Sequence, residues 1–202
     1  MLALAVAGCP DEAMAAANGL VDAAEATHNP FVLSIALFTY GITYRDADPL
    51  RALDALRRGL AIAQDSGNRF NETNLAANLA RLEAEHGDPL AALDHDSLAI
   101  RNYHDSGSTG MARTALAVLA VVLDRLGHHE SAATIAGFAF SPLTAAAVSD
   151  INTTIAHLRE VLGDQTYESL ARKGETMTIA AMATYAYDQI DQARTALNAV
   201  SE

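Results

Sequence analysis

The sequence predicts an all-α fold, a right-handed stack of antiparallel helical hairpins with a period of about 40 residues and an irregular helical bundle at its C-terminal end. The first observation is a segment that occurs twice, DPLRALDALRRGLAIAQDSG at 48–67 and DPLAALDHDSLAIRNYHDSG at 88–107, with nine of twenty positions identical. The second is a composition rich in alanine, without tryptophan and sparse in glycine and proline, which is typical of closely packed helices. The third is the helical spacing of leucines between glycines.

Each copy of this segment begins and ends as a helix does. Asp48 and Asp88 can cap free backbone N–H groups, and the proline that follows stands at the first helical position, where its missing N–H has no cost. Gly67 and Gly107 can adopt the left-handed conformation that terminates a helix. We therefore expect one helix in each copy, from the aspartate to the residue before the glycine.

The segment between the two copies predicts a partner helix for each hairpin. Residues 68–87 end in a glycine and place their leucines on one helical stripe, formed by Leu75, Leu79 and Leu82. Residues 106–127 reproduce that pattern forty positions later and also end in a glycine. The two kinds of helix therefore alternate along the chain.

The same register extends upstream and downstream. We expect helices from Pro10 to about Thr27 and from Pro30 to near Asp46, and a further helix that opens at 128. No β-strand is expected. The predicted breaks lie near Asn29, Ala47, Gly67, Gly87, Gly107, Gly127 and Ser141.

The first residues fit the register as the last turns of a helix over 2–8. Since the chain then starts in the middle of a repeat, we expect it to be a fragment of a longer protein or a truncated reading frame. VAGC at 6–9 imitates a lipoprotein signal, but no Lys or Arg precedes it and its apolar run is shorter than a signal core. Cys9 is the single cysteine, which excludes an intrachain disulfide and is typical of a reducing compartment. A cytoplasmic location is therefore expected.

The period fails after residue 140, where Ser141 and Pro142 interrupt the chain. The last repeat of an array must cover an apolar face that no neighbour buries, so irregular terminal helices are expected. They are predicted over about 145–162, 166–173 and 177–199, with Gly163 and Gly174 between them. We thus expect repeats over 1–140 and capping helices over 141–202, both within one domain.

Three stretches carry a family resemblance: RALDALRRGLAIAQDSGNRF (51–70), DRLGHHESAATIAG (124–137) and LGDQTYESLARKGETMTIAAMATYA (162–186). Together they resemble the C-terminal tetratricopeptide-like region of large bacterial ATP-binding transcriptional regulators, the LuxR/MalT-like proteins, and of adenylate-cyclase–ATPase fusion proteins. The last stretch is the most specific, because ordinary tetratricopeptide repeats lack it.

The resemblance covers nearly the whole chain and implies a tetratricopeptide-like α-solenoid. In that family an ATPase or cyclase domain precedes the array, and a DNA-binding helix-turn-helix often follows it. This sequence contains no G-x-x-x-x-G-K-[ST] phosphate loop and no recognition helix. The resemblance therefore implies the regulatory, sensing or scaffolding part alone.

Charge and hydropathy exclude two classes of partner. Thirteen Lys and Arg against 25 Asp and Glu give a formal net charge of −12. A duplex-binding surface needs clustered cations to neutralise phosphates, so this segment is not expected to bind nucleic acid. The apolar stretches fall short of the ~20 residues that a membrane span requires, so no membrane association is expected.

Motifs for catalysis or metal binding are absent from the sequence. It contains no G-x-S-x-G element, and Asp94, His95 and Asp96 point in three directions on one helix. No histidine has a partner at a spacing such as H-E-x-x-H. The seven histidines are His28, His86, His95, His104, His128, His129 and His157. We therefore expect no enzyme activity, no cofactor and no metal site.

One polar stripe stands out in the predicted helix over 68–86. Asn71, Asn74, Asn78 and Arg81 follow helical rows beside the leucine stripe. Asn is less favourable in a helix than Ala by about half a kcal/mol. Three asparagines on one stripe therefore suggest that their side chains have a function. Asn side chains on the concave face of stacked hairpins can bind a peptide backbone through paired donors and acceptors. The alternative is a solvated helix face with no partner.

The corresponding positions of the neighbouring helices complete the expected groove. Ser34 and Phe38 lie forty residues before the stripe, and Thr114 lies forty residues after it. The expected function is a non-catalytic interaction or sensor module of a larger bacterial signalling or transcriptional regulator, which binds a protein segment or a sister domain there. The alternative is a small-ligand (inducer) sensor of the MalT type that controls self-association. An open end of the array also makes a homodimer possible.

Overall fold

The computed structural model describes residues 10–148 and 150–200, and all regular structure within them is α-helical. No β-strand occurs in these two ranges, which confirms the predicted all-α class. The helix expected over 2–8 lies outside the described residues. Nor does any helix in these ranges combine the length and the hydrophobicity needed to cross a bilayer.

The chain divides into two compact units, the first ending at His86 and the second starting at Gly87. This division differs from the predicted change at residue 140, where the repeat register ends. The helices beyond 140 share a unit with those of 87–139.

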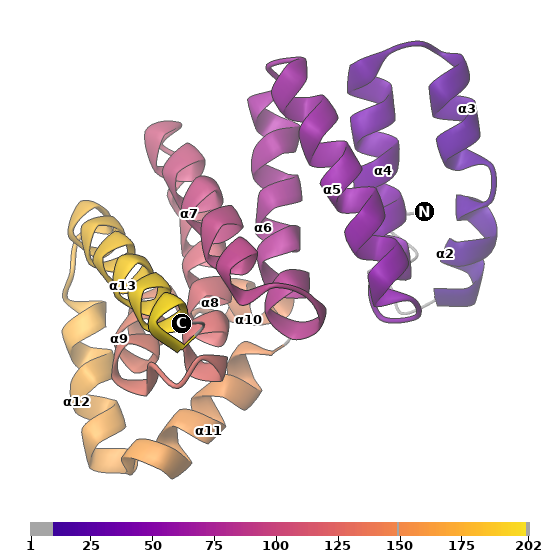
Figure 1. The fold of residues 1–202 in the computed structure, drawn as a ribbon. Coiled ribbons are helices and arrows are strands. Elements are labelled where there is room, and N and C mark those ends of the chain that lie inside the picture. The colour runs from indigo at the N-terminus through magenta and orange to yellow at the C-terminus, as the bar shows by residue number, and fades with distance from the viewer. Residues whose placement is uncertain (1–9, 149, 201–202) are drawn as a thin grey trace. The chain divides into compact units, whose positions relative to one another are not determined.

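The first unit consists of paired helices joined by short turns (Figure 1). Its helices are α2 (Pro10–Ala17), α3 (Leu20–Ala26), α4 (Pro30–Tyr44), α5 (Pro49–Asp65) and α6 (Arg69–His86). The single helix predicted over 10–27 is interrupted, because Gly19 takes a left-handed conformation (φ 74°) between α2 and α3. The other boundaries lie at the predicted breaks.

The sequence explains how α4, α5 and α6 begin, end and pack. The Asp48 carboxylate accepts the N–H of Arg51 at 3.1 Å and so caps α5, and Gly67 ends it with φ 68°. α5 packs against both α4 and α6. Leu56 lies directly over Gly41 of α4, where an added Cβ would stand 2.5 Å from Leu56 Cγ. Glycine at this position therefore lets the two helices approach closely.

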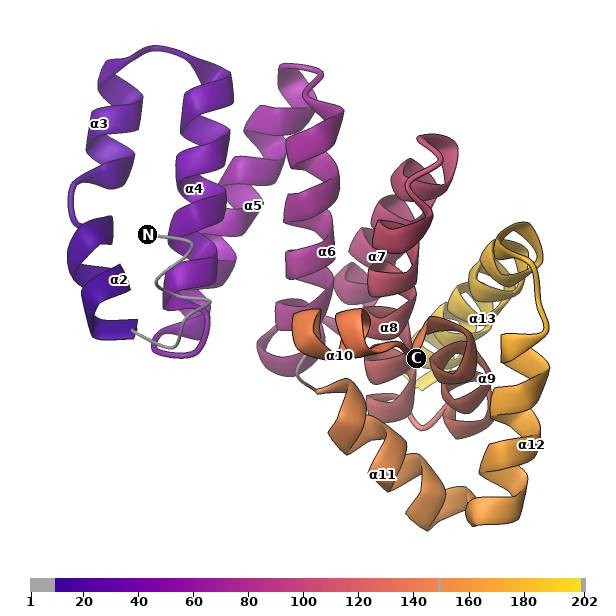
Figure 2. The same cartoon turned by 180° about the vertical axis from the view of Figure 1, so that it is seen from behind.

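The second unit contains seven helices in the described ranges, some of which form an irregular group around α9. They are α7 (Pro89–Asp105), α8 (Thr109–Arg125), α9 (His129–Ala139), α10 (Pro142–Ala147), α11 (Ile151–Leu162), α12 (Asp164–Glu175) and α13 (Ile179–Val200). α12 lies beside α9, α11 contacts α8 and α9, and α13 packs mainly on α7 (Figures 1 and 2).

The structure corrects two details of the predicted C-terminal helices. The expected helix over 145–162 is two helices, α10 and α11, because the chain leaves helical geometry at Val148. Gly174 was expected to separate two helices but lies within the last turn of α12. Its role is packing: a Cβ there would overlap the Thr134 carbonyl oxygen of α9. Gly137 of α9 approaches the backbone of Ala171 in the same way.

Candidate functional site

Two of the predicted binding residues, Asn71 and Ser34, are buried in the first unit. Asn71 is 3% exposed and Ser34 is fully buried. The Asn71 amide donates a hydrogen bond to Ser34 Oγ at 2.8 Å, and Ser34 Oγ donates to the Phe31 carbonyl at 3.0 Å. Since a buried polar group needs a partner, the two side chains satisfy each other between α4 and α6. Their assignment to a partner-binding surface is therefore wrong, and they join two helices instead.

The next two residues of the stripe, Asn74 and Asn78, are half-buried. Each donates its amide N–H to a carbonyl one turn earlier, Asn74 to Phe70 and Asn78 to Asn74, both at 2.8 Å. The neighbouring Leu75 and Leu79 are fully buried, as predicted. The two amides thus lie at the border between the core and the surface of α6.

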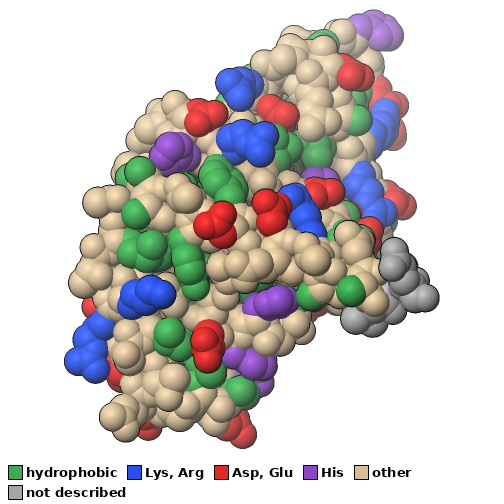
Figure 3. All heavy atoms as spheres, turned by 60° about the vertical axis from the view of Figure 1, so that its left-hand side comes forward, with side chains coloured by type: hydrophobic (Ala, Val, Ile, Leu, Met, Phe, Trp, Pro, Cys, Tyr) green, Lys and Arg blue, Asp and Glu red, His purple; other side chains and the backbone are tan. Residues whose placement is uncertain are grey.

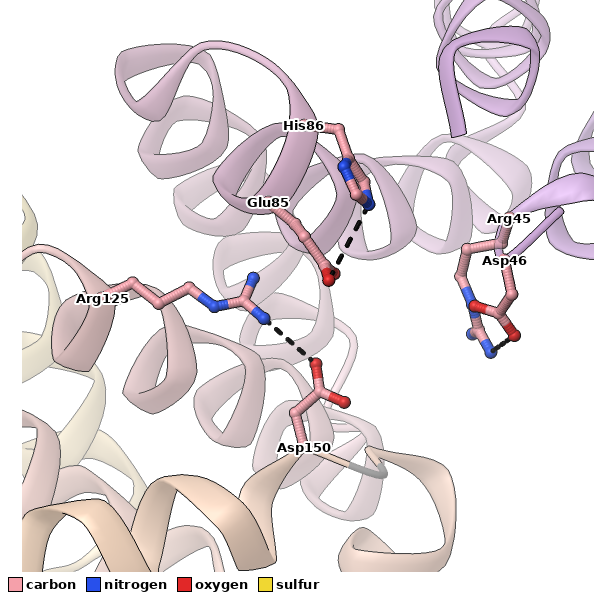
Figure 4. Close-up of polar contacts among 6 residues, drawn as sticks. All are labelled: Arg45, Asp46, Glu85, His86, Arg125 and Asp150. Carbon is pink, nitrogen blue, oxygen red and sulfur yellow. Dashed lines mark hydrogen bonds and ion pairs between the residues drawn. The ribbon is translucent and has the colours of Figure 1, made fainter. Parts of the chain in front are cut away.

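Arg81 is half-buried and acts on a neighbouring acid. A hydrogen bond from Arg45 lowers the pKa of Asp46, burial opposes this effect, and the charge of Arg81 lowers the pKa further. Arg45 Nε lies 3.0 Å from Asp46 Oδ1 (Figure 4). The carboxylate of Asp46 therefore compensates part of the positive charge of Arg45 and Arg81 within the first unit.

The remaining predicted positions divide between the units. Phe38 is half-buried on α4 of the first unit. Thr114 is half-buried on α8 of the second unit, where its hydroxyl donates to the Gly110 carbonyl at 3.4 Å. Further along α8, Arg125 donates to Asp150 at 3.5 Å (Figure 4).

Sequence reasoning missed the exposed apolar side chains that flank the buried Asn71–Ser34 pair. Phe31 and Ile35 of α4 are 51% and 36% exposed, and Phe70 at the start of α6 is 74% exposed. We name the surface formed by Phe31, Ile35, Phe70, Asn74 and Asn78 the α4–α6 face. Phe70 does not lie on the leucine stripe of its helix. An aromatic residue outside the apolar stripe is the sequence signal that could have identified it.

A cavity of ≈ 340 Å³ opens in the first unit between the α2–α3 turn, α4 and α5. Its wall includes Arg51, whose guanidinium stacks on Tyr40 and Tyr44 at 5.0 and 4.5 Å from the ring centroids. Arg58, also in the wall, pairs with Glu25. Burial raises the pKa of Tyr40, and the charge of Arg51 partly counters that rise. Arg51 has no acidic side chain within ion-pair distance among the described residues.

A third feature is a cluster of Asp124, His129 and His157 in the second unit, which we name the His–Asp cluster. His129 Nδ1 lies 3.0 Å from Asp124 Oδ1, and His157 Nδ1 lies 2.9 Å from Asp124 Oδ2. The spacing of the histidines gave no indication of it, because His157 follows His129 by 28 positions and comes from another helix. Only tertiary structure brings these three groups together.

The described surface thus offers an apolar and amide face, a cavity lined by both Arg and Asp side chains, and a His–Asp cluster. On the face shown in Figure 3, Lys and Arg side chains lie among acidic and hydrophobic ones. Comparison with known proteins gave no further assignment: no protein-family model, no curated protein and no solved structure matches this chain.

Proposed function

We propose that this chain is a non-catalytic interaction or sensor module of a larger bacterial signalling or transcriptional regulator. In this proposal its hairpins form a right-handed, tetratricopeptide-like stack, and the α4–α6 face binds an extended segment of a partner protein or sister domain. The helix starts at Pro49 and Pro89, forty residues apart, and the left-handed glycines at Gly67 and Gly107 support the repeat. The observation that carries the binding proposal is the exposed apolar surface of α4 and α6.

The exposed apolar side chains are concentrated rather than scattered. Nine large hydrophobic residues are exposed in the described ranges, and four of them lie on α4 or at the start of α6: Phe31, Val32, Ile35 and Phe70. Such patches mark interaction sites more often than scattered apolar residues do. Since the patch spans the N-terminal parts of only two helices, it fits an extended segment with large apolar side chains.

The half-buried amides give the same face a polar border. The carbonyl oxygen of an Asn side chain accepts hydrogen bonds, and its NH₂ group has two donors, of which the bond to the helix uses one. Asn78, which donates one N–H to the Asn74 carbonyl, can therefore pair with the backbone of a segment whose apolar side chains contact Phe31 and Phe70. The apolar contacts supply affinity, and this amide fixes the direction of the bound segment.

The α4–α6 face can be tested with a defined ligand. We expect a phage-displayed library of random dodecapeptides, selected on the intact chain, to yield peptides with apolar anchors. Phe70→Ser is expected to weaken such a peptide about 10- to 100-fold, because burial of a Phe side chain contributes about 1.5–3 kcal/mol. Fluorescence anisotropy with a labelled peptide measures the affinity.

The matched control is Leu143→Ser, which makes a similar change at a residue that is 75% exposed on α10. Both variants should unfold within about 0.5 kcal/mol of the wild type, since their side chains are exposed. Loss of affinity in the Leu143 variant, or unchanged affinity in the Phe70 variant, would contradict the proposed face.

A second candidate function, a small-ligand sensor, is favoured by the cavity beside α5. Its volume lies in the range of small-molecule sites, about 300–1,000 Å³. Arg51 is held in position by two tyrosine rings and is not engaged by an acidic side chain of the described residues. A guanidinium held in this way suits a carboxylate or phosphate group of a small metabolite.

The cavity is tested by thermal denaturation in the presence of carboxylate and phosphate metabolites. A ligand at 100 times its dissociation constant is expected to stabilise the fold by about 2.7 kcal/mol. Arg51→Gln should abolish this stabilisation, whereas Arg172→Gln, at an exposed site on α12, should retain it. A shift that persists in the Arg51 variant would exclude the cavity as the site.

A further inference from the structure

We propose that the His–Asp cluster is a binding site for a divalent transition-metal ion of the zinc class. Its ligands are Asp124 Oδ, His129 Nδ1 and His157 Nδ1. All three atoms lie within 4.8 Å of one another in the second unit. The proposal is independent of the function proposed above.

The backbone explains why two of the ligands are adjacent. Asp124 lies in the last turn of α8, and Gly127, with φ 81°, reverses the chain immediately after it. The N–H groups of Gly127 and His128 bond the carbonyls of Asp124 and Leu123 at 3.0 and 2.9 Å. α9 then begins at His129, so this imidazole meets the carboxylate across a tight turn.

The third ligand comes from α11, which contacts both α8 and α9. Leu158, the residue after His157, is fully buried and fixes that turn of α11 in the core. His157 itself is exposed, while Asp124 is buried and His129 is half-buried. The cluster is thus rigid on its inner side and open to solvent on its outer side, which leaves space for a water ligand.

The atoms that converge are suited to a metal ion. Both imidazoles direct the same nitrogen, Nδ1, toward one carboxylate, at 2.9–3.0 Å. In a tetrahedral site with bonds of about 2.0–2.1 Å, neighbouring ligand atoms stand about 3.3 Å apart. Small side-chain shifts therefore convert the hydrogen-bonded cluster into a coordinating one, with the remaining imidazole proton moved to Nε2.

The ligand set indicates the class of metal. Imidazole nitrogens suit Zn²⁺, Cu²⁺ and Ni²⁺, whereas Mg²⁺ and Ca²⁺ prefer oxygen ligands. Two imidazoles and one carboxylate leave a bound Zn²⁺ with a net charge of +1 and one open position. The nearest cation in the sequence, Arg125, is directed to Asp150 (Figure 4), so its charge is partly compensated. A bound ion would join α8, α9 and α11.

The proposal is tested with the full chain after removal of metal by a chelator and dialysis. We expect one equivalent of Co²⁺ to bind and to give the visible absorption bands of tetrahedral Co²⁺, and Zn²⁺ to displace it. Zn²⁺ at 100 times its dissociation constant should raise the melting temperature by roughly 5–10 °C.

Single substitutions decide which residues bind. His157→Gln and His129→Gln should each weaken Co²⁺ binding more than about 100-fold, because loss of even an outer-shell partner costs 10–100-fold. His128→Gln is the matched control, since this neighbouring histidine lies outside the cluster and its variant should bind as the wild type does. Circular dichroism of each metal-free variant verifies that it is folded, and the exposed position of His157 makes its variant the decisive one.

Three results would contradict the proposed metal site. No tetrahedral Co²⁺ spectrum at one equivalent, or a spectrum retained in folded His157→Gln, would overturn the proposal. Equal losses in the His128 and His129 variants would also overturn it, because they would indicate binding by surface histidines in general.

Discussion

Gly174→Ala is expected to destabilise the second unit by about 3 kcal/mol or more, which is the largest effect that we predict for a single methyl group. A Cβ at residue 174 would overlap the carbonyl oxygen of Thr134 on α9. The obstacle is backbone, so no side-chain rotation relieves it and α12 must move away from α9. The gain in helix propensity from Gly to Ala, about 1 kcal/mol, is too small to compensate.

The measurement is thermal or urea unfolding monitored by circular dichroism, in which the melting temperature should fall by roughly 10 °C. Gly110→Ala is the control, because Gly110 also lies in a helix but a Cβ there would meet nothing within 4 Å. This control should gain up to about 1 kcal/mol. A Gly174 variant as stable as the wild type would show that α9 and α12 are not in backbone contact.

Asp96→Leu is expected to stabilise the protein by roughly 1–3 kcal/mol at neutral pH, the usual cost of an unsatisfied buried polar group. Asp96 is fully buried, and neither carboxyl oxygen has a hydrogen-bond partner in the described parts of the chain. In the repeated segment it occupies the position of Leu56, which is a fully buried core residue. The repeat itself therefore supplies the replacement side chain.

Because Asp96 is buried, we also expect the free energy of unfolding to depend on pH. Burial raises the pKa of Asp96 well above 3.8, so the folded state retains a proton that the unfolded chain loses above about pH 4. Where the folded state binds more protons, stability falls as pH rises. The wild type should therefore lose stability, relative to Asp96→Asn, from about pH 4 upward until the folded-state carboxyl ionises.

Urea unfolding of both proteins at several pH values measures this difference. Asp94→Asn is the matched control, since Asp94 is exposed two residues earlier on the same helix. Its unfolding free energy should differ from that of the wild type by at most about 1 kcal/mol, as for an exposed ion pair. A difference between the Asp96 variant and the wild type that does not change with pH would show that this carboxyl titrates normally.

The sequence predicted helix boundaries well wherever the signal was local. Asp48 and Asp88 cap their helices, and Gly67 and Gly107 end them in the left-handed conformation. These features depend on a few neighbouring residues and on the sterics of their own backbone. The break at Gly19 was missed because glycine is also tolerated inside a helix, at a cost of only about 1 kcal/mol.

Prediction of the candidate site was less successful, because exposure is not a local property. The helical rows correctly placed Leu75 and Leu79 in the core, but they could not show that Asn71 meets Ser34 on another helix. The same limit explains Phe70, which the pattern leaves off the leucine stripe but does not identify as a surface anchor.

The sequence by itself thus determined the all-helical class, the positions where most helices begin and end, and the leucines that face the core. Caps, left-handed glycines and apolar periodicity act over one or two turns, so they can be recognised in a single segment. Tertiary structure alone decided that Gly174 packs on Thr134 and that Asp124, His129 and His157 converge. Those contacts join residues that are 28 to 40 positions apart or lie on different helices, and only the packing of helices brings such groups together.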